Sequence, residues 1–128
     1  MPKVLVIDDE RNMLTLLDLL LREEGFDVLL ADDGLKGLDC YRRERPDVIL
    51  LDLNLPVLDG IEVLKQIRAT DLEQPVIVLT GDTRPEKERQ VRTLGVNEFI
   101  VKGQSLQGLI DALKHLLTGN HSDGRLAT

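Results

Sequence analysis

The chain has 128 residues, of which 42% are hydrophobic and 30% are charged. This length and composition are typical of one folded globular domain and exclude a disordered chain. The formal net charge of −7 argues against direct nucleic-acid binding by this chain, because phosphate contacts need a basic surface. No apolar stretch approaches the ~20 residues of a membrane span, and the single cysteine, Cys40, cannot form an internal disulfide. These features favour a cytoplasmic protein that does not contact a membrane.

The first third of the chain combines two strand patterns with one helix pattern. Residues 4–7 are continuously apolar and mostly β-branched, which predicts a strand buried on both faces of a parallel sheet. Apolar residues from 13 to 21, Leu16 among them, form a helical stripe that ends at Gly25, a typical C-cap. The shorter apolar run at 26–31 contains a charged residue, so we expect this strand at the edge of the sheet.

The middle of the chain continues this alternation. Apolar residues recur at every third position after Leu35 and predict a second helix, which Pro46 ends. Residues 48–51 predict another buried strand, because they are apolar without interruption. Asp59 followed by Glu62 is a capping-box pattern, and it predicts the start of a third helix.

The fourth strand and helix follow the same order, but the helix has few apolar anchors. Residues 76–79 predict a further buried strand. Thr83 followed by Glu86 predicts the N-terminal cap of the next helix. Only Val91 and Leu94 are expected to face inward, so this helix should be held less firmly than the others.

The last strand is predicted at 99–101 and the last helix at 106–117. Residues 118–128 have no apolar periodicity, so we expect them to be a polar tail or the start of a linker. Five alternating strand–helix units imply a parallel sheet with helices on both faces. Right-handed crossovers and the weak second strand favour the strand order 2-1-3-4-5. The chain is therefore predicted to be a single α/β domain of the doubly wound (βα)5 type over residues 1–117.

Polar residues follow four of these strands and should meet at one edge of the sheet. They are Asp8, Asp9, Asp52, Thr80 and Lys102. Two ionised carboxylates about 4 Å apart repel by ~1 kcal/mol in water and by ~4 kcal/mol at an effective dielectric constant of 20. Three carboxylates therefore need counter-charge, which the lysine and a hard divalent cation such as Mg²⁺ can supply. A single strand-end acid is more often a helix cap, and Asp9 is such a candidate for the first helix, but the set of five favours metal and phosphoryl chemistry.

Asp52 is the candidate nucleophile of this site. An acidic pocket repels a free phosphate, and the Gly-rich loop that would cradle a nucleotide phosphate after the first strand is missing. A metal-neutralised carboxylate can instead attack phosphorus and form an aspartyl phosphate. Lys102 would then offset charge that develops on the phosphoryl oxygens, and Thr80 would donate a hydrogen bond to the product.

Two other classes of function use a similar set of residues. A phosphatase with an aspartate nucleophile would need a second acid two residues after Asp52, where this chain has Asn54. A module that only docks proteins would have little reason to keep the acids, Thr80 and Lys102 together. Sustained turnover of phosphoesters would indicate the first class, and failure to take up a phosphoryl group would indicate the second.

Four motifs together make the chain resemble the receiver domain of bacterial two-component response regulators, from residue 3 to about 117. In chain order they are Val6 to Glu10 (VIDDE), Asp52 to Gly60 (DLNLPVLDG), Leu79-Thr80, and Phe99 to Lys102 (FIVK). Each motif is moderately specific, and the ordered set is highly specific. The resemblance implies a flavodoxin-like fold and a signalling domain that is not an enzyme, apart from its own phosphorylation and dephosphorylation.

The resemblance also implies a role for each site residue. Asp52 would accept a phosphoryl group from a phosphohistidine on a sensor histidine kinase or a phosphotransfer protein. Thr80 and Phe99 match the switch pair, in which the hydroxyl moves to the phosphoryl group and the aromatic ring turns inward. The cofactor would be Mg²⁺, with Mn²⁺ as an alternative, and its ligands would be Asp8, Asp9, Asp52 and the backbone carbonyl of Asn54.

The chain departs from the family pattern at two glycines. Lys102-Gly103 replaces the usual Lys-Pro, which disfavours a cis peptide bond there. Gly81 replaces a common alanine and should leave space beside the phosphoryl site. Asn54 and Asp82 occupy the positions that resemble those tuning phosphoryl lifetime, and our hypothesis is that Asp82 orients the attacking water.

Phosphorylation adds roughly two negative charges at the site. A helix or loop with two alternative conformations must respond to this charge if distant parts of the domain are to change. We expect the weakly anchored fourth helix to respond, and the surface of helix four, strand five and helix five to be the output face. Expected partners are an output domain or a partner protein, with a phosphorylation-dependent homodimer as an alternative. The sequence is compatible both with a stand-alone regulator and with a receiver cut from a longer chain.

Overall fold

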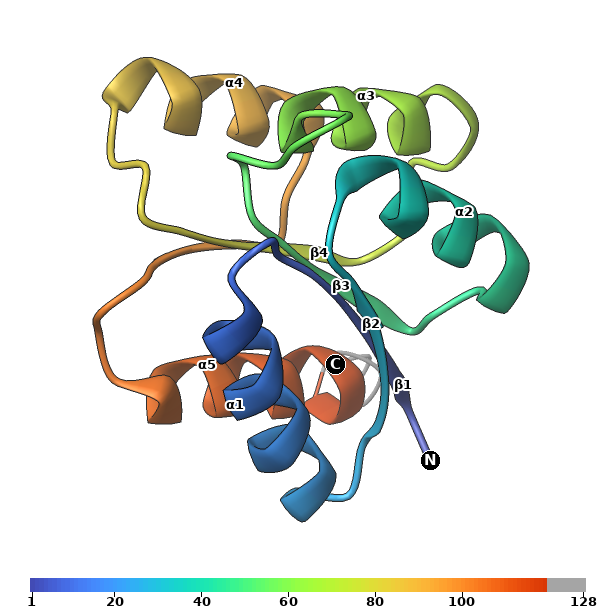
Figure 1. The fold of residues 1–128 in the computed structure, drawn as a ribbon, viewed down its shortest axis with the longest axis vertical. Coiled ribbons are helices and arrows are strands. Elements are labelled where there is room, and N and C mark those ends of the chain that lie inside the picture. The colour runs from blue at the N-terminus through green and yellow to red at the C-terminus, as the bar shows by residue number, and fades with distance from the viewer. Residues whose placement is uncertain (120–128) are drawn as a thin grey trace, which may run out of the picture.

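The computed structural model describes residues 1–119, and within them five parallel strands form one sheet in the order β2-β1-β3-β4-β5. Helices α2, α3 and α4 cover one face of this sheet, and α1 and α5 cover the other (Figure 1). The predicted fold class, strand order and edge position of the second strand are therefore confirmed. The strands are β1 (Lys3–Ile7), β2 (Asp27–Ala31), β3 (Val48–Leu51), β4 (Val76–Thr80) and β5 (Glu98–Val101). The helices are α1 (Arg11–Glu23), α2 (Gly34–Glu44), α3 (Gly60–Thr70), α4 (Pro85–Leu94) and α5 (Leu106–Lys114).

Each central strand contributes side chains to both faces of the sheet, which explains why its sequence is apolar without interruption. In β1, Leu5 and Ile7 belong to the core beneath α2 and α3, whereas Val4 and Val6 belong to the core beneath α1 and α5. All residues of β3 and β4 are buried. Cys40 is also buried.

The apolar stripes of two helices are narrower than the sequence pattern predicts. Leu16 on α1 is 40% exposed and Leu35 on α2 is 56% exposed. The buried side of α2 instead begins at Gly34, whose backbone lies so close to Leu58 that a Cβ there would collide with the Leu58 carbonyl oxygen. Because successive helical residues are about 100° apart, this close packing turns Leu35 toward solvent.

The starts of the helices agree with one capping prediction and contradict two. Asp59 caps α3, since its carboxylate accepts a hydrogen bond from the Ile61 amide at 3.3 Å. Thr83 is not the cap of α4: the N-cap residue is Arg84, and in the described structure this helix begins without a side-chain cap. Nor does Asp9 cap α1, because the N-cap residue is Glu10 and its amide donates to Asp8 at 2.9 Å. The interpretation of Asp9 as a structural cap is therefore wrong.

The last two helices bear on the predicted output face. Of the residues in α4, all of which are described, only Val91 is fully buried, and Leu94 packs partly against the core. The predicted helix at 106–117 is helical throughout: α5 ends at Lys114, and a π-helical turn, η1 (His115–Gly119), continues it. Residues 120–128, which belong to the predicted tail or linker, lie outside the described residues. Within the described part of the chain, no helix is long and apolar enough to cross a membrane.

Candidate functional site

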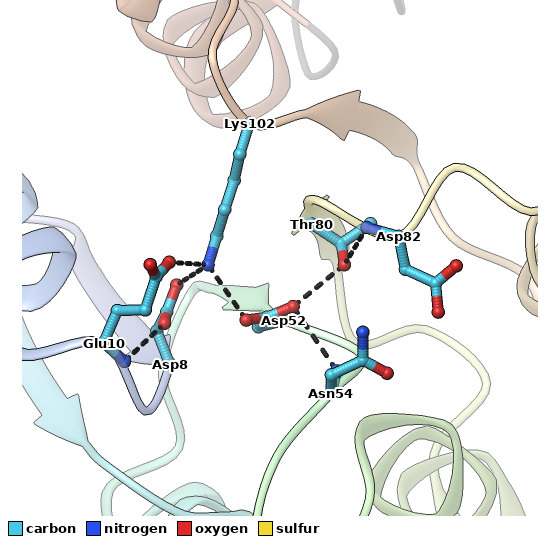
Figure 2. A network of polar contacts seen from close by, with 7 residues as sticks. All are labelled: Asp8, Glu10, Asp52, Asn54, Thr80, Asp82 and Lys102. Carbon is cyan, nitrogen blue, oxygen red and sulfur yellow. Dashed lines mark hydrogen bonds and ion pairs between the residues drawn. The ribbon is translucent and has the colours of Figure 1, made fainter.

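The strand pairing brings the predicted site residues to one edge of the sheet. Ile7 is paired with Leu51, so Asp8 and Asp52 leave neighbouring strands at the same level. Thr80 ends β4 and is paired with Val101, which places Lys102 beside it. Figure 2 shows that Asp8, Thr80 and Lys102 surround the carboxylate of Asp52.

Lys102 joins the acids of the site through its ammonium group. Its Nζ atom lies 2.9 Å from Asp52 Oδ2, 2.8 Å from Asp8 Oδ2 and 2.5 Å from Glu10 Oε1. The side chain is only 13% exposed. Burial alone would lower the pKa of Lys102, but its hydrogen bonds to the three carboxylates outweigh that effect and raise the pKa above its ordinary value. The ammonium therefore stays charged at neutral pH.

Hydrogen bonds hold the other oxygen of the Asp52 carboxylate. The Thr80 hydroxyl donates to Asp52 Oδ1 at 2.9 Å, and the backbone amide of Asn54 lies 3.4 Å from the same atom. The amide of Asp82 in turn donates to the Thr80 hydroxyl oxygen at 3.1 Å. Asp52 is thus buried with one oxygen facing a hydroxyl and the other facing an ammonium, a fixed orientation for a nucleophile.

Asp8, Asp9 and Asp52 form the acidic part of the site, and each offers an oxygen atom within 4.8 Å of the others. Asp8 and Asp52 are buried, whereas Asp9 is exposed. Burial raises the pKa of Asp8 despite its contact with Lys102. One ammonium group cannot neutralise this cluster and Glu10 together. Closely spaced hard oxygen donors with excess negative charge are what a divalent cation of the Mg²⁺ type requires, so these residues fit such a metal.

Sequence reasoning missed two residues of this network. Glu10 lies in the first motif and received no role, yet its carboxylate contacts Lys102. Arg84 was not singled out at all, and its guanidinium binds both carboxylate oxygens of Asp82. The spacing of Arg84 two residues after an acid is too common a pattern to have indicated this pair.

The sequence model of the response regulator receiver domain family matches residues 4–114. The chain belongs to this family. It is 39% identical to the transcriptional regulatory protein PrrA of Mycobacterium tuberculosis over 91% of its own length, and it spans about half (50%) of that protein. It is 33% identical to the sporulation initiation phosphotransferase F of Bacillus subtilis, over 90% of this chain and 93% of that protein.

Solved structures of other receiver domains have the same fold. The receiver domain of the Francisella response regulator 1452 is 31% identical and superposes with a TM-score of 0.87 over 94% of this chain and 99% of that one. The chemotaxis protein CheY4 of Vibrio cholerae is also 31% identical, with a TM-score of 0.83 over 91% of this chain and 98% of that one. The flavodoxin-like architecture predicted from the sequence is therefore confirmed.

The two unusual glycines of this receiver domain lie beside the site. A Cβ atom added to Gly81 would meet nothing within 4 Å, so the expected space next to Thr80 is present. Gly103 has a φ of +93°, a left-handed conformation that favours glycine. None of the peptide bonds in residues 1–119, including Lys102–Gly103, is cis.

Phe99 lies on β5 beneath α4 and is partly buried. Its ring packs against the core on the α3 and α4 side of the sheet. The guanidinium carbon of Arg92, on α4, lies 6.0 Å from the ring centroid. The aromatic ring therefore lies against α4, the helix with the fewest fully buried residues among those described.

Proposed function

We propose that this receiver domain takes a phosphoryl group onto Asp52 from a phosphohistidine of a sensor histidine kinase or a phosphotransfer protein. The observation that carries the proposal is the orientation of the Asp52 carboxylate between the Thr80 hydroxyl and the Lys102 ammonium. A carboxylate oxygen would attack phosphorus, the phosphorus–nitrogen bond would break, and the imidazole nitrogen would keep its electron pair. Lys102 would offset charge on the transferred oxygens without losing a proton, and Thr80 would donate to the product.

The proposed metal ligands are Asp8, Asp9, Asp52 and the backbone carbonyl of Asn54, with Mg²⁺ as the cation and Mn²⁺ as the alternative. The donor set of buried and exposed carboxylates supports this assignment. When bound, the cation offsets the negative charge of both the acids and the phosphoryl oxygens. The residues of the chain supply the nucleophile, the fixed ammonium and the hydroxyl donor. Turnover would be limited to phosphorylation and dephosphorylation of Asp52 itself, in the cytoplasm.

The test is the intact mass of the protein after incubation with acetyl phosphate and Mg²⁺. We expect one phosphoryl adduct, which does not form when the metal is chelated beforehand and is absent in Asp52→Asn, because the amide cannot act as the nucleophile. Asp39→Asn, a change of the same kind at an exposed position on α2, should carry the adduct as the parent does. Sustained release of phosphate from phosphoesters would indicate an enzyme instead, and a parent protein without an adduct would indicate a docking module.

We further propose that phosphorylation changes the surface formed by α4, β5 and α5. The Thr80 hydroxyl now bonded to Asp52 would turn to the phosphoryl group, and Phe99 beneath α4 would turn inward. The scarcity of buried residues in α4 supports its role as the responsive element. This surface would contact an output domain, a partner protein or a second copy of the chain.

Amide hydrogen exchange with and without beryllofluoride and Mg²⁺ tests this switch. We expect altered exchange across residues 82–102, because α4 is the least anchored helix and lies next to the site. Helix α2, which contacts β1 and α3, should exchange at the same rate in both states. Identical exchange across 82–102 in the two states would contradict the proposed output face.

A further inference from the structure

An ion pair between a buried acid and an exposed arginine lies immediately beside the proposed phosphorylation site. Arg84 Nε lies 2.9 Å from Asp82 Oδ1, and Arg84 Nη2 lies 2.6 Å from Asp82 Oδ2. The backbone amide of Arg84 also donates to Asp82 Oδ1, at 3.2 Å. The Asp82 side chain is 5% exposed, whereas that of Arg84 is 57% exposed. The exposed Arg84 side chain therefore binds both oxygens of a buried carboxylate.

Asp82 is connected through Thr80 to the carboxylate of Asp52. Its amide donates to the Thr80 hydroxyl oxygen, and that hydroxyl donates to Asp52. Figure 2 shows the Asp82 carboxylate turned away from Asp52. The carboxylate is therefore close to the site but faces its own ion pair.

We propose that Arg84 is a positioning residue that sets the lifetime of the aspartyl phosphate by holding the Asp82 carboxylate away from the attacking water. The inference rests on the proposed phosphorylation of Asp52. In hydrolysis, a water oxygen bonds to phosphorus, the bond between phosphorus and the Asp52 oxygen breaks, and inorganic phosphate leaves. The water must give up a proton during this step, and a nearby free carboxylate is a suitable acceptor.

Both oxygens of Asp82 are occupied by charge-assisted hydrogen bonds, which are the strong ones in proteins. A carboxylate held in this way is a poor proton acceptor and is not aimed at the phosphoryl group. The hypothesis that Asp82 orients the attacking water is therefore restricted to the carboxylate released from Arg84. If Arg84 is removed, the carboxylate is released beside Thr80, where Gly81 leaves open space. The freed carboxylate can then orient and deprotonate water, so the phosphoryl group should be lost faster.

The test uses intact mass to follow the decay of the phosphoryl adduct. The phosphorylated protein is first separated from the phosphoryl donor and transferred into a buffer that contains Mg²⁺. We expect Arg84→Gln to shorten the half-life about tenfold, a part of what a fully placed general base contributes. Arg84→Lys, which keeps the charge but not the paired geometry, should be intermediate. Arg89→Gln removes the same charge from an exposed position on α4, the helix that Arg84 precedes, and should decay as the parent does.

The double variant separates positioning from a structural effect. In an Asp82→Ala background, Arg84→Gln should leave the half-life unchanged, because there is no carboxylate to release. If Arg84→Gln decays like the parent, or if its effect persists without Asp82, the role of Arg84 is wrong. If the parent forms no adduct at all, the proposed function itself fails, so the two failures are distinguishable.

Discussion

Lys102→Met is expected to slow phosphoryl uptake by Asp52 by about a hundredfold or more. Loss of one preorganised charge aimed at transition-state oxygens typically costs 10²- to 10³-fold in rate. Here the ammonium also holds Asp8, Glu10 and Asp52 together, so its loss leaves neighbouring carboxylates to repel one another and the incoming donor. The measurement is the initial rate of adduct formation with acetyl phosphate at saturating Mg²⁺.

A matched control is Lys65→Met, the same replacement at an exposed position on α3. It should take up the phosphoryl group at the parent's rate. Uptake by Lys102→Met within threefold of that rate would show that the ammonium does not take part in the transfer, and that the proposed charge balance is mistaken.

The same variant should change how the stability of the metal-free protein depends on pH. Burial already raises the pKa of Asp8 above the ordinary value of an aspartate, and this pKa should rise further without the ammonium. The folded variant then binds a proton that the unfolded chain has lost, so its free energy of unfolding falls as the pH rises from about 4 through the raised pKa. Unfolding curves in chelator at pH 5 and pH 8 should therefore differ more for Lys102→Met than for the parent.

The sheet and the main site residues could be predicted because they depend on regular patterns. A strand buried on both faces needs an unbroken apolar run, and the end of that run marks the edge of the sheet. Once the strands are known to be parallel, Asp8, Asp52, Thr80 and Lys102 must share one edge. Family resemblance then assigns chemistry to positions that the topology has already brought together.

The contacts of long side chains could not be predicted in the same way. Glu10 and Arg84 find their partners across loops whose shapes depend on the whole fold. The loop after β3 shows the difficulty, because Val57 has a φ of +69° and the Leu58 amide donates to the Pro56 carbonyl at 2.7 Å. This is a γ-turn with a β-branched residue in the left-handed region, a conformation that turn signals normally assign to glycine or asparagine.

Helix starts were also hard to predict. Thr83 and Glu86 have the spacing of a capping box, yet the chain enters α4 at Pro85 from Arg84. Asp82 accepts a hydrogen bond from the Arg84 amide. The side chain that binds an amide at the start of α4 therefore belongs to the residue before Thr83, the expected cap. Local sequence patterns do not show which of two neighbouring acceptors, Asp82 or Thr83, forms the hydrogen bond. That depends on which side chain is buried beside the site.

Arg68→Ala is expected to lower the free energy of unfolding by about 3 kcal/mol, since it removes several hydrogen bonds from a charged donor to partly buried carbonyls. The guanidinium of Arg68 donates from α3 to the Leu94 and Gly95 carbonyls at 3.0 and 2.6 Å. It also donates to Asp71 and Gln74 carbonyls in the loop after α3, at 3.0 and 2.8 Å. One side chain thus ties this loop to the C-terminal end of α4.

Denaturant unfolding at neutral pH measures this loss, which corresponds to a fall in melting temperature of about 10 °C for a domain of this size. Arg42→Ala is the matched control, because Arg42 is exposed on α2 and makes only a 3.4 Å contact with Gln66 in the described structure. Arg68→Lys should be nearly as destabilised as Arg68→Ala, since an ammonium cannot reproduce the planar set of donors. If Arg68→Lys were as stable as the parent, a positive charge at this position would be enough to stabilise the fold, and the planar set of donors would not be needed.

The exchange of α4 separates the role of Arg68 from a general loss of stability. Arg68 fixes the C-terminal end of α4, and Val91 is the single fully buried residue of this helix among those described. The amide hydrogens of Arg92–Gly95 should therefore exchange faster in Arg68→Ala. The Arg84 end, held by Asp82, should change less. Uniformly faster exchange along the helix would contradict this, because it would mean that α4 opens as one unit and that Arg68 does not hold one end of the proposed output surface.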